Sequence, residues 1–461
     1  VDFVTSIIVA RLVMPEAYGL MGMALVVVGF VNVLQGLGFG PAVIRRKHLS
    51  QGFLSTLFFS HLIFSVVSLA ALTALAPLLS WVYGDQRVTM VVILFSLVSV
   101  LSAAGGIPAA LLNREMRFFE LALVDIVASL ARSITAVSLA YAGWEVWSLV
   151  SASLAGSLVQ TVGVWTAARW RARLYFRCSH LSEVFGFAAN LTGTRVVNYL
   201  SRGMVDFIIG ALLGAHQLGI YSVAARFMLL PREAIADVIM NVFFPVFSRI
   251  QDDDALLGRT VTRVSGAIAL VVFPCVFGIV AVAPLFINNV LGPKWSPALP
   301  VMYALAPVGA IYAILVPASH IYLAKGRTGL MFAWELVRAA ILIASTLIGA
   351  NWGILGVALM WTVANVCLAV PNFVIPLRLI KGFSMLTFLS ELIPYSACAC
   401  AMCVCVVTLR TALEELFISR LIVLLVSVVT GVFVYSVLVY GLRLPGLESI
   451  HKLVFGQTRV R

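Results

Sequence analysis

The stretch SLVSASLAGSLVQTVGVWTAA, residues 148–168, contains no charged side chain and is long enough for a helix to cross a lipid bilayer. Comparable apolar runs recur along the whole chain, for example FISRLIVLLVSVVTGVFVYSVLVY at residues 417–440. Hydrophobic residues make up 62% of the chain and charged residues only 11%, whereas soluble domains carry about 25% charged residues. Membrane β-barrels show alternating patterns in blocks of about 10 residues instead of continuous runs. The sequence therefore predicts an all-α polytopic membrane protein.

The apolar runs divide the chain into fourteen predicted membrane helices, the first of them truncated. The chain has no initiator Met and is apolar from Val1, so we expect it to begin inside its first helix. The predicted spans are 1–13, 19–37, 53–80, 88–112, 121–141, 146–168, 184–213, 218–247, 264–287, 298–323, 329–349, 353–376, 385–408 and 418–441.

Most of the 31 Lys and Arg residues lie in alternate loops between these spans. Examples are the cluster at 45–47 and the four arginines between 169 and 177. Cytoplasmic loops of membrane proteins carry this excess of positive charge. We therefore expect both termini in the cytoplasm, and the net charge of +12 reflects membrane topology, with no need for nucleic acid as a partner.

An internal repeat relates the two halves of the chain. SIIVARLVMPEAYGLMG (6–22) aligns with DFIIGALLGAHQLGIYS (206–222) at an offset of 200, which places Gly19 on Gly219, and Arg132 aligns with Arg338 at an offset of 206. Both repeats start from the same side of the membrane, so the repeat is parallel, an arrangement common in transporters that bind substrate near the midplane. The predicted parts are an N-lobe of six helices (1–183), a C-lobe of six helices (184–380) and two C-terminal helices with a tail (381–461).

Polar side chains recur every fourth residue in the span that opens the second repeat, from Asn190 through Thr194, Asn198 and Arg202 to Asp206. Charged groups inside a membrane normally face a bundle interior or a water-filled cavity. One interpretation is purely structural, because Arg202–Asp206 and Glu335–Arg338 have the spacing of salt bridges within a helix. The other interpretation is a cavity that binds an anion, because guanidinium groups recognise phosphate bidentately.

We take the second interpretation as a hypothesis for the whole set, in which the arginines outnumber the acids that obviously pair with them. The predicted substrate-binding residues are Arg195, Asn198, Arg202, Asp206, Arg226, Arg132 and Arg338. The candidates for ion coupling are Asp125, Glu233, Asp237 and Glu335.

No pattern in the sequence indicates enzyme chemistry. The stretch CACAMCVC (398–405) has the spacing of metal ligands, but it lies within an apolar span with no histidine or acid nearby, so we expect neither a metal nor a cofactor. Extramembrane loops are too short for a soluble catalytic domain, and no nucleophile and base occur together. The chain is therefore not expected to be an enzyme.

Several segments resemble the polysaccharide transporters, or Wzx-type flippases, of the MOP superfamily, and among these the colanic-acid exporter branch. The resemblance lies in their order and spacing and extends over nearly the whole chain. The segments are ARLVMPEAYGLMGMA (10–24), GWEVWSLV (143–150), LLGAHQLGIYSVAARFMLLP (212–231), FPVFSRIQDD (244–253) and VLGPKWSPALPVMYALAP (290–307).

The resemblance implies two six-helix lobes around a cationic cavity in the bacterial inner membrane. It also implies that an undecaprenyl-diphosphate-linked oligosaccharide moves from the cytoplasmic to the periplasmic leaflet by alternating access, in the biosynthesis of exopolysaccharide, capsule or lipopolysaccharide O-antigen. Membrane lipids and a polysaccharide polymerase are further candidate partners. The chain departs from the family pattern at the truncated first helix, where relatives place cavity residues.

Two other functions remain open from the sequence. A multidrug or small-solute exporter of the same superfamily would use acidic residues for cation coupling, and Asp125, Glu233, Asp237 and Glu335 are available. A membrane glycosyltransferase or polymerase would need catalytic carboxylates in large outside loops, and the loops here are short. The buried arginines favour the flippase over both.

Overall fold

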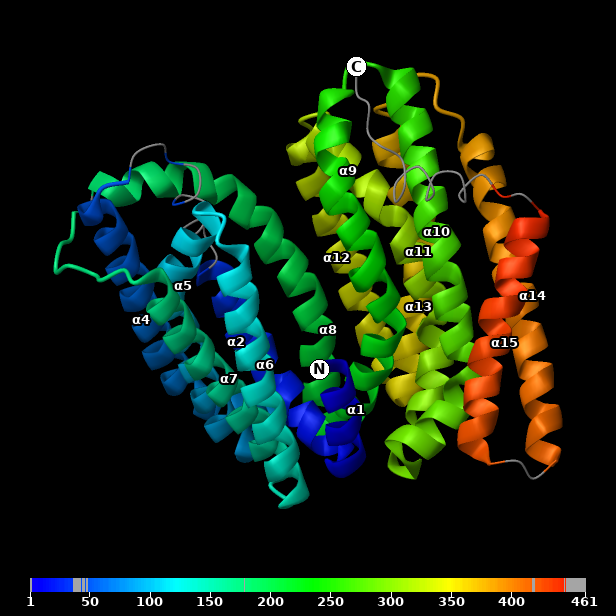
Figure 1. Ribbon diagram of the computed structural model, residues 1–461, viewed down its shortest axis with the longest axis horizontal. Coiled ribbons are helices and arrows are strands. Elements are labelled where there is room, and N and C mark those ends of the chain that lie inside the picture. Colours follow the sequence, from blue (N-terminus) through cyan, green and yellow to red (C-terminus); the bar gives the residue numbers. More distant parts are fainter. Residues whose placement is uncertain are drawn as a thin grey trace. The chain divides into compact units, whose positions relative to one another are not determined.

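The chain is helical throughout the part that the structure describes (Figure 1). The computed structural model describes residues 2–35, 43, 46, 49–177, 179–416, 419–442 and 444, and it describes the backbone alone at residues 2, 3, 179–195, 198 and 241. Among these residues, 12 helices are long and apolar enough to cross a membrane. The prediction of an all-α polytopic membrane protein is confirmed.

The chain forms two compact units, Val1–Ser222 and Val223–Arg461. In the first unit α6 packs along α7, and α5 packs against α2, α4 and α7. The predicted lobes 1–183 and 184–380, and the C-terminal part 381–461, are defined by the sequence repeat and stay a prediction. The helices that begin in the first unit are α1 (Asp2–Leu12), α2 (Pro15–Gln35), α4 (Gln51–Tyr83), α5 (Arg87–Arg114), α6 (Phe118–Tyr141), α7 (Glu145–Ala168) and α8 (Ser179–Pro231), of which α8 continues into the second unit.

The second unit is built around α10, which packs against α11, α14 and α15, while α13 lies against α11 and α12. Its core includes the fully buried Phe388 and the ring of Phe373 beside it, with centroids 5.3 Å apart. The remaining elements are the π-helix η1 (Arg232–Ala236), α9 (Asp237–Arg249), α10 (Asp254–Leu285), the π-helix η2 (Phe286–Leu291), the 3₁₀ turn η3 (Pro293–Trp295), α11 (Ala298–Ala324), α12 (Thr328–Ala350), α13 (Gly353–Leu377), α14 (Met385–Glu415) and α15 (Arg420–Gly441).

Two local features distort the backbone along α8 and at its end. Gly214 has φ 83° and ψ 173°, which breaks the helix between the predicted spans 184–213 and 218–247. After Pro231 the backbone adopts the π-helix η1, in which the N–H of Asp237 donates to the carbonyl of Arg232. Proline cannot donate its own hydrogen bond, and π-turns are a common way to absorb such a defect. Pro231 therefore marks a distortion of the helix.

The predicted spans place successive loops on opposite sides of the membrane. Two contacts in the structure join loops that are predicted to lie on the same side. In the first unit, the N–H of Met14 donates to Glu145 Oε2 at 3.0 Å, which joins two loops of one predicted side. The Nη1 of Arg114 donates to the carbonyl of Val43 at 2.6 Å, which joins two loops of the other predicted side. These two contacts in the first unit agree with the alternation of sides that the span count predicts. The assignment of these sides to cytoplasm and periplasm stays a prediction.

The repeat-related segments of the first unit touch each other backbone to backbone. A Cβ placed on Gly19 of α2 would lie 1.7 Å from the carbonyl oxygen of Ala215, and a Cβ on Gly219 of α8 would lie 1.8 Å from the carbonyl oxygen of Pro15. Gly19 corresponds to Gly219 in the repeat, and Pro15 to Ala215, so the contact is reciprocal, as in an interface about a two-fold axis. Only glycine permits this approach of two helices.

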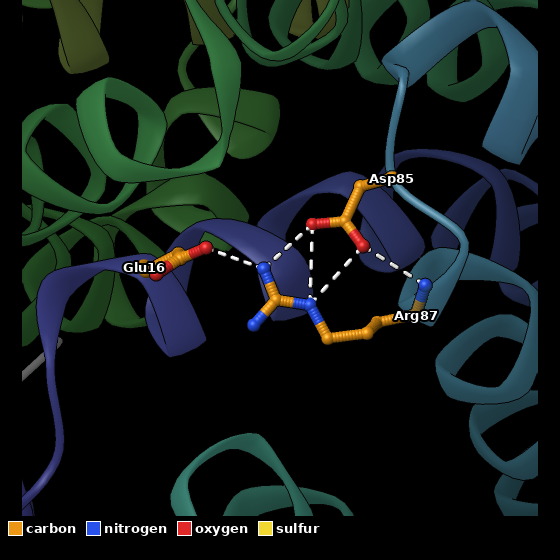
Figure 2. Close-up of polar contacts among 3 residues, drawn as sticks. All are labelled: Glu16, Asp85 and Arg87. Carbon is orange, nitrogen blue, oxygen red and sulfur yellow. Dashed lines mark hydrogen bonds and ion pairs between the residues drawn. The ribbon is translucent and has the colours of Figure 1, made fainter.

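An ion-pair cluster joins the first turn of α2 to the start of α5 and the turn before it (Figure 2). Arg87 Nη2 donates to Asp85 Oδ2 at 2.8 Å and also to Glu16 Oε1. These hydrogen bonds to the Arg87 guanidinium hold the pKa of Asp85 below its usual range. Arg87 and Glu16 are each about half exposed, at 50% and 46%. The cluster therefore fixes the relative positions of α2 and α5, and it adds little stability because water competes for its members.

We expect Gly19→Ala to destabilise the protein, because no rotamer adjustment relieves a clash between a Cβ and a backbone carbonyl. The loss should be at least about 2 kcal/mol, in the range of overpacked cores. Thermal unfolding of the purified protein in nanodiscs measures it. Gly329→Ala is the matched control, because a Cβ there has nothing within 4 Å. Equal melting temperatures for the two variants would contradict the close crossing.

Arg87→Gln should lower stability at neutral pH by at most about 1 kcal/mol, because the pairs are half exposed. The ordinary pKa of an aspartate is about 3.9, and that of Asp85 is lower in the folded protein, so its contribution is full above pH 4 and is lost as the pH falls through the folded value. The difference in melting temperature between Arg87→Gln and the unmodified protein should therefore shrink as the pH is lowered from 7 to 3. Arg259→Gln is the control, because Arg259 Nε bonds only to the carbonyl of Ala255 in its own helix. A difference that stays constant over this range would show that Asp85 is not part of the interaction.

Candidate functional site

The middle of α6 in the first unit carries a polar face whose side chains contact α7. The two helices approach closely because α7 has glycines at the contact, and a Cβ on Gly156 would lie 2.8 Å from Arg132 Nε. The Arg132 side chain therefore passes directly over α7. Asp125, Ser129 and Arg132 share one face of α6, as their spacing predicts.

Arg132 is exposed and makes no hydrogen bond or ion pair with any residue that the structure describes. Asp125, seven residues earlier on the same face, accepts a hydrogen bond from Gln160 Nε2 of α7 at 3.1 Å and leaves Arg132 alone. An unpaired guanidinium near the centre of a membrane helix costs several kcal/mol if it contacts hydrocarbon. The α6 face at Arg132 is therefore suited to line water or an anion.

The polar stripe of α8 is described only in part. Arg195 and Asn198, both predicted to bind substrate, have side chains outside the described residues. Arg202 is exposed, and Asp206 is half-buried within electrostatic range of the hydroxyls of Tyr83 and Tyr199. No ion pair joins Arg202 to Asp206 in the described part of the chain, although their spacing permits one. The salt bridge that the structural interpretation requires at this position is absent there.

Arg226 belongs to the second unit and also lacks a partner. Its side chain is exposed, with no hydrogen bond or ion pair to the described residues. It lies 12 residues beyond the break at Gly214, which is about 18 Å along the helix and within the predicted span 218–247. Glu233, one of the coupling candidates, is likewise exposed and unpaired within the described part.

Arg338 of α12, the repeat counterpart of Arg132, has the opposite environment. Its Nη2 and Nε donate to Glu335 Oε2 at 2.6 and 3.1 Å, and the two side chains are only 13% and 15% exposed. Arg338 Nη1 lies 3.5 Å from the hydroxyl of Tyr312, which donates to Asn365 Oδ1 at 2.7 Å. The ion pair that the spacing of Glu335 and Arg338 permits is therefore present. The assignment of Arg338 to substrate binding and of Glu335 to ion coupling stays a prediction.

Arg232 is a site residue that the sequence analysis missed. Its Nη2 lies 3.4 Å from Asp237 Oδ1, and its guanidinium carbon lies 5.8 Å from the centre of the Tyr312 ring. Residues five apart do not face each other on an α-helix, but they do on a π-helix, and both lie at the ends of η1. Regular α-helical spacing does not hold across η1, so the sequence alone does not show that Arg232 and Asp237 face each other.

Tyr312, Asn365 and Gln160 were also missed. Each is a polar residue in an otherwise apolar span, but none belongs to a periodic pattern that would single it out. A signal was available for Gln160, which is the only strongly polar residue in the stretch 148–168. In the described ranges, no three His, Cys, Asp or Glu side chains come together as metal ligands would.

The family described as "Polysaccharide biosynthesis protein" matches residues 8–300 of the chain. The chain belongs to this family. Residues 8–300 include Gly19 and Gly219, which form the close helix contact. They also include Arg132 and Arg226, the two arginines without an ion pair to the described residues.

Two relatives are similar to this member of the polysaccharide biosynthesis protein family over most of its length. The succinoglycan biosynthesis transport protein ExoT of Rhizobium meliloti (strain 1021) is 26% identical over 396 residues, which are 85% of this chain and 78% of ExoT. The lipopolysaccharide biosynthesis protein WzxC of Escherichia coli (strain K12) is 24% identical over 393 residues, which are 84% of this chain and 79% of WzxC. The resemblance to Wzx-type polysaccharide transporters is confirmed.

Two solved structures share the fold. The lipid II flippase MurJ in an inward closed conformation superimposes with a TM-score of 0.73 and 17% identity, over 96% of this chain and 97% of MurJ. An inward-facing multidrug resistance transporter of the MATE family, in the MOP superfamily, gives a TM-score of 0.66 and 14% identity, over 83% of this chain and 95% of that transporter. At these identities the likeness shows the fold alone.

Glu335→Gln should destabilise the second unit by roughly 3 kcal/mol, because it leaves the largely buried Arg338 charge without its carboxylate. The double variant Glu335→Gln/Arg338→Met should regain most of this loss, since it removes the uncompensated charge. Thermal unfolding in nanodiscs measures both. A double variant no more stable than Glu335→Gln would show that the pair is not the source of the effect.

Proposed function

We propose that the chain is a flippase that moves an undecaprenyl-diphosphate-linked oligosaccharide from the cytoplasmic to the periplasmic leaflet of the bacterial inner membrane. In this proposal the polar helix faces contact the headgroup and the chain works by alternating access. Both termini are cytoplasmic, as the distribution of Lys and Arg among the loops indicates. A polysaccharide polymerase that consumes the flipped product is a candidate partner.

The observation that carries the proposal is the presence of arginines without acid partners within predicted membrane spans. Arg132 and Arg226 are exposed and have no partner among the described residues, whereas Arg338 is neutralised by Glu335. An unpaired guanidinium in a low-dielectric setting binds an oxyanion strongly and bidentately. A phosphate group supplies such oxygens, so it suits each of these arginines taken by itself.

The names of the similar proteins support the same class of substrate. MurJ is described as a lipid II flippase, ExoT as a transport protein of succinoglycan biosynthesis and WzxC as a lipopolysaccharide biosynthesis protein. Each name concerns the export or assembly of a cell-surface saccharide. The family match over residues 8–300 supports a role in the biosynthesis of exopolysaccharide, capsule or O-antigen here.

A cation-coupled exporter is the second candidate, and the likeness to a multidrug transporter favours it. Such a function requires acids free to bind the coupling ion. Asp125 is hydrogen-bonded to Gln160, Asp237 lies beside Arg232, and Glu335 is paired with Arg338. Among the four coupling candidates, Glu233 alone is unpaired in the described part. The acids therefore support this candidate less well than the arginines support the flippase.

The test is to delete the gene and then to complement the deletion with Arg132→Gln and Arg226→Gln. Loss of the arginines should reduce surface polymer at least tenfold and cause lipid-linked oligosaccharide to accumulate in the cytoplasmic leaflet, because a hydrogen bond to a charged group contributes roughly 1.5–3 kcal/mol. Arg132→Lys and Arg226→Lys should retain partial activity, since lysine keeps the charge and loses the bidentate geometry.

Arg259→Gln is the control for the loss of one exposed arginine, because Arg259 bonds to its own helix. Protein levels in the membrane, measured by immunoblot, separate loss of transport from loss of folding. Normal polymer and normal lipid pools in the deletion strain, together with increased drug sensitivity, would replace the flippase with the exporter.

A further inference from the structure

The side chains around Tyr312 in the second unit form a polar and aromatic cluster that includes residues beyond the predicted site. Tyr312 of α11 lies between Arg232 of η1 and Trp361 of α13, with the Arg232 guanidinium carbon 5.8 Å and the Trp361 ring 5.9 Å from the centre of the Tyr312 ring. The Trp361 and Tyr312 rings meet edge to face, at 79°. We call these three residues the Tyr312 cluster.

Two hydrogen-bond donors of the Tyr312 cluster have no acceptor in the described part of the chain. They are Arg232 Nε and Trp361 Nε1, and both atoms are buried. Trp361 itself is 8% exposed. An indole N–H can only donate, and an unsatisfied buried donor costs about 1–3 kcal/mol, so such groups call for an acceptor from outside the protein. Two of them beside one aromatic ring point to a ligand with several acceptor oxygens.

The charged residues around Tyr312 indicate whether a ligand of the Tyr312 cluster would be an anion or a neutral molecule. Arg232 is balanced by Asp237 at 3.4 Å, and Arg338, which reaches Tyr312, is balanced by Glu335 at 2.6 Å. The surroundings of the cluster are therefore close to neutral, unlike those of Arg132 and Arg226. An oxyanion would gain little net attraction here. A neutral polyhydroxyl compound matches the mixture of donors, acceptors and aromatic faces.

We propose that the Tyr312 cluster binds a neutral pyranose unit of the translocated saccharide, with Arg232 Nε and Trp361 Nε1 donating to its oxygens. The inference rests on the proposed function and extends it, because it gives the sugar a site separate from the arginines that suit the diphosphate. Aromatic rings offer an apolar surface for the C–H groups of a pyranose, and the surrounding polar groups orient its hydroxyls.

Saturation-transfer difference NMR on the purified full chain in nanodiscs tests the site. Nanodiscs avoid maltoside detergents, which carry the same sugar chemistry. The probes are methyl β-D-glucopyranoside, methyl β-D-galactopyranoside, glucose 1-phosphate and inorganic phosphate. At least one of the two glycosides should receive saturation, and phosphate at equal concentration should not displace it. A signal from phosphate that competes with both glycosides would overturn the proposal in favour of an anion site.

Trp361→Phe removes the unsatisfied N–H and keeps an aromatic ring, and Arg232→Gln removes the other donor. Each should weaken glycoside binding roughly five- to tenfold, which corresponds to one hydrogen bond of about 1–1.4 kcal/mol. Trp334→Phe is the matched control, because the Trp334 indole N–H already donates to Asn372 Oδ1 at 2.5 Å. Melting temperatures of all three variants report whether they fold.

Unchanged glycoside affinity in folded Trp361→Phe and Arg232→Gln would overturn the site and leave ordinary water as the acceptor for these donors. Absence of any glycoside signal from the unmodified protein would overturn it as well. Both results are separate from the leaflet measurement in the deletion strain. A chain that binds glycosides but does not move lipid-linked oligosaccharide would keep the Tyr312 cluster and lose the proposed function.

Discussion

A guanidinium group inside a membrane span must have either an acid or water beside it, and this constraint organises both units of the protein. Arg338 donates two hydrogen bonds to Glu335 and lies largely buried in the second unit. Arg132, its counterpart in the repeat, has no such acid: Asp125 is bonded to Gln160, and the Arg132 side chain stays exposed. The same position in the two repeats is therefore paired with an acid in one and exposed, without an ion pair to the described residues, in the other.

Helix packing makes this difference possible. Glycine at position 156 lets α7 approach α6 so closely that the Arg132 side chain passes over the backbone of its neighbour. At the corresponding crossing of α12 and α13, Gly349 and Gly356 bring two backbones together, with a Cβ on Gly356 only 2.4 Å from the carbonyl oxygen of Gly349. Small residues thus fix both helix pairs without large side chains, which is how membrane helices associate when hydrophobic burial gives no driving force.

The sequence predicted the spans well, because a run of about 20 apolar residues has one stable solution in a bilayer. The sequence did not indicate which charged side chains form ion pairs. Arg202–Asp206 and Glu335–Arg338 have equally suitable spacing, yet the described part of the chain contains only the second pair, since the choice depends on what neighbouring helices supply. Arg232 escaped notice for a different reason. The π-helix after Pro231 rotates the residues that follow, and no periodic pattern in the sequence marks that rotation.

The two repeats of the chain share a fold but differ in the charges around corresponding residues. In the proposed function, this difference lets one chain recognise two chemically different parts of a substrate. A lipid-linked saccharide has an anionic part and a polyhydroxyl part, and these require opposite environments: net positive charge for the first, and balanced donors and acceptors with aromatic surfaces for the second. In the proposed function, Arg132 and Arg226 suit the anionic part, and the neutral surroundings of Tyr312 suit the polyhydroxyl part. A transporter of small cations would need neither an unpaired arginine nor a buried indole N–H without an acceptor. The combination fits a large amphipathic substrate whose parts are held at different places.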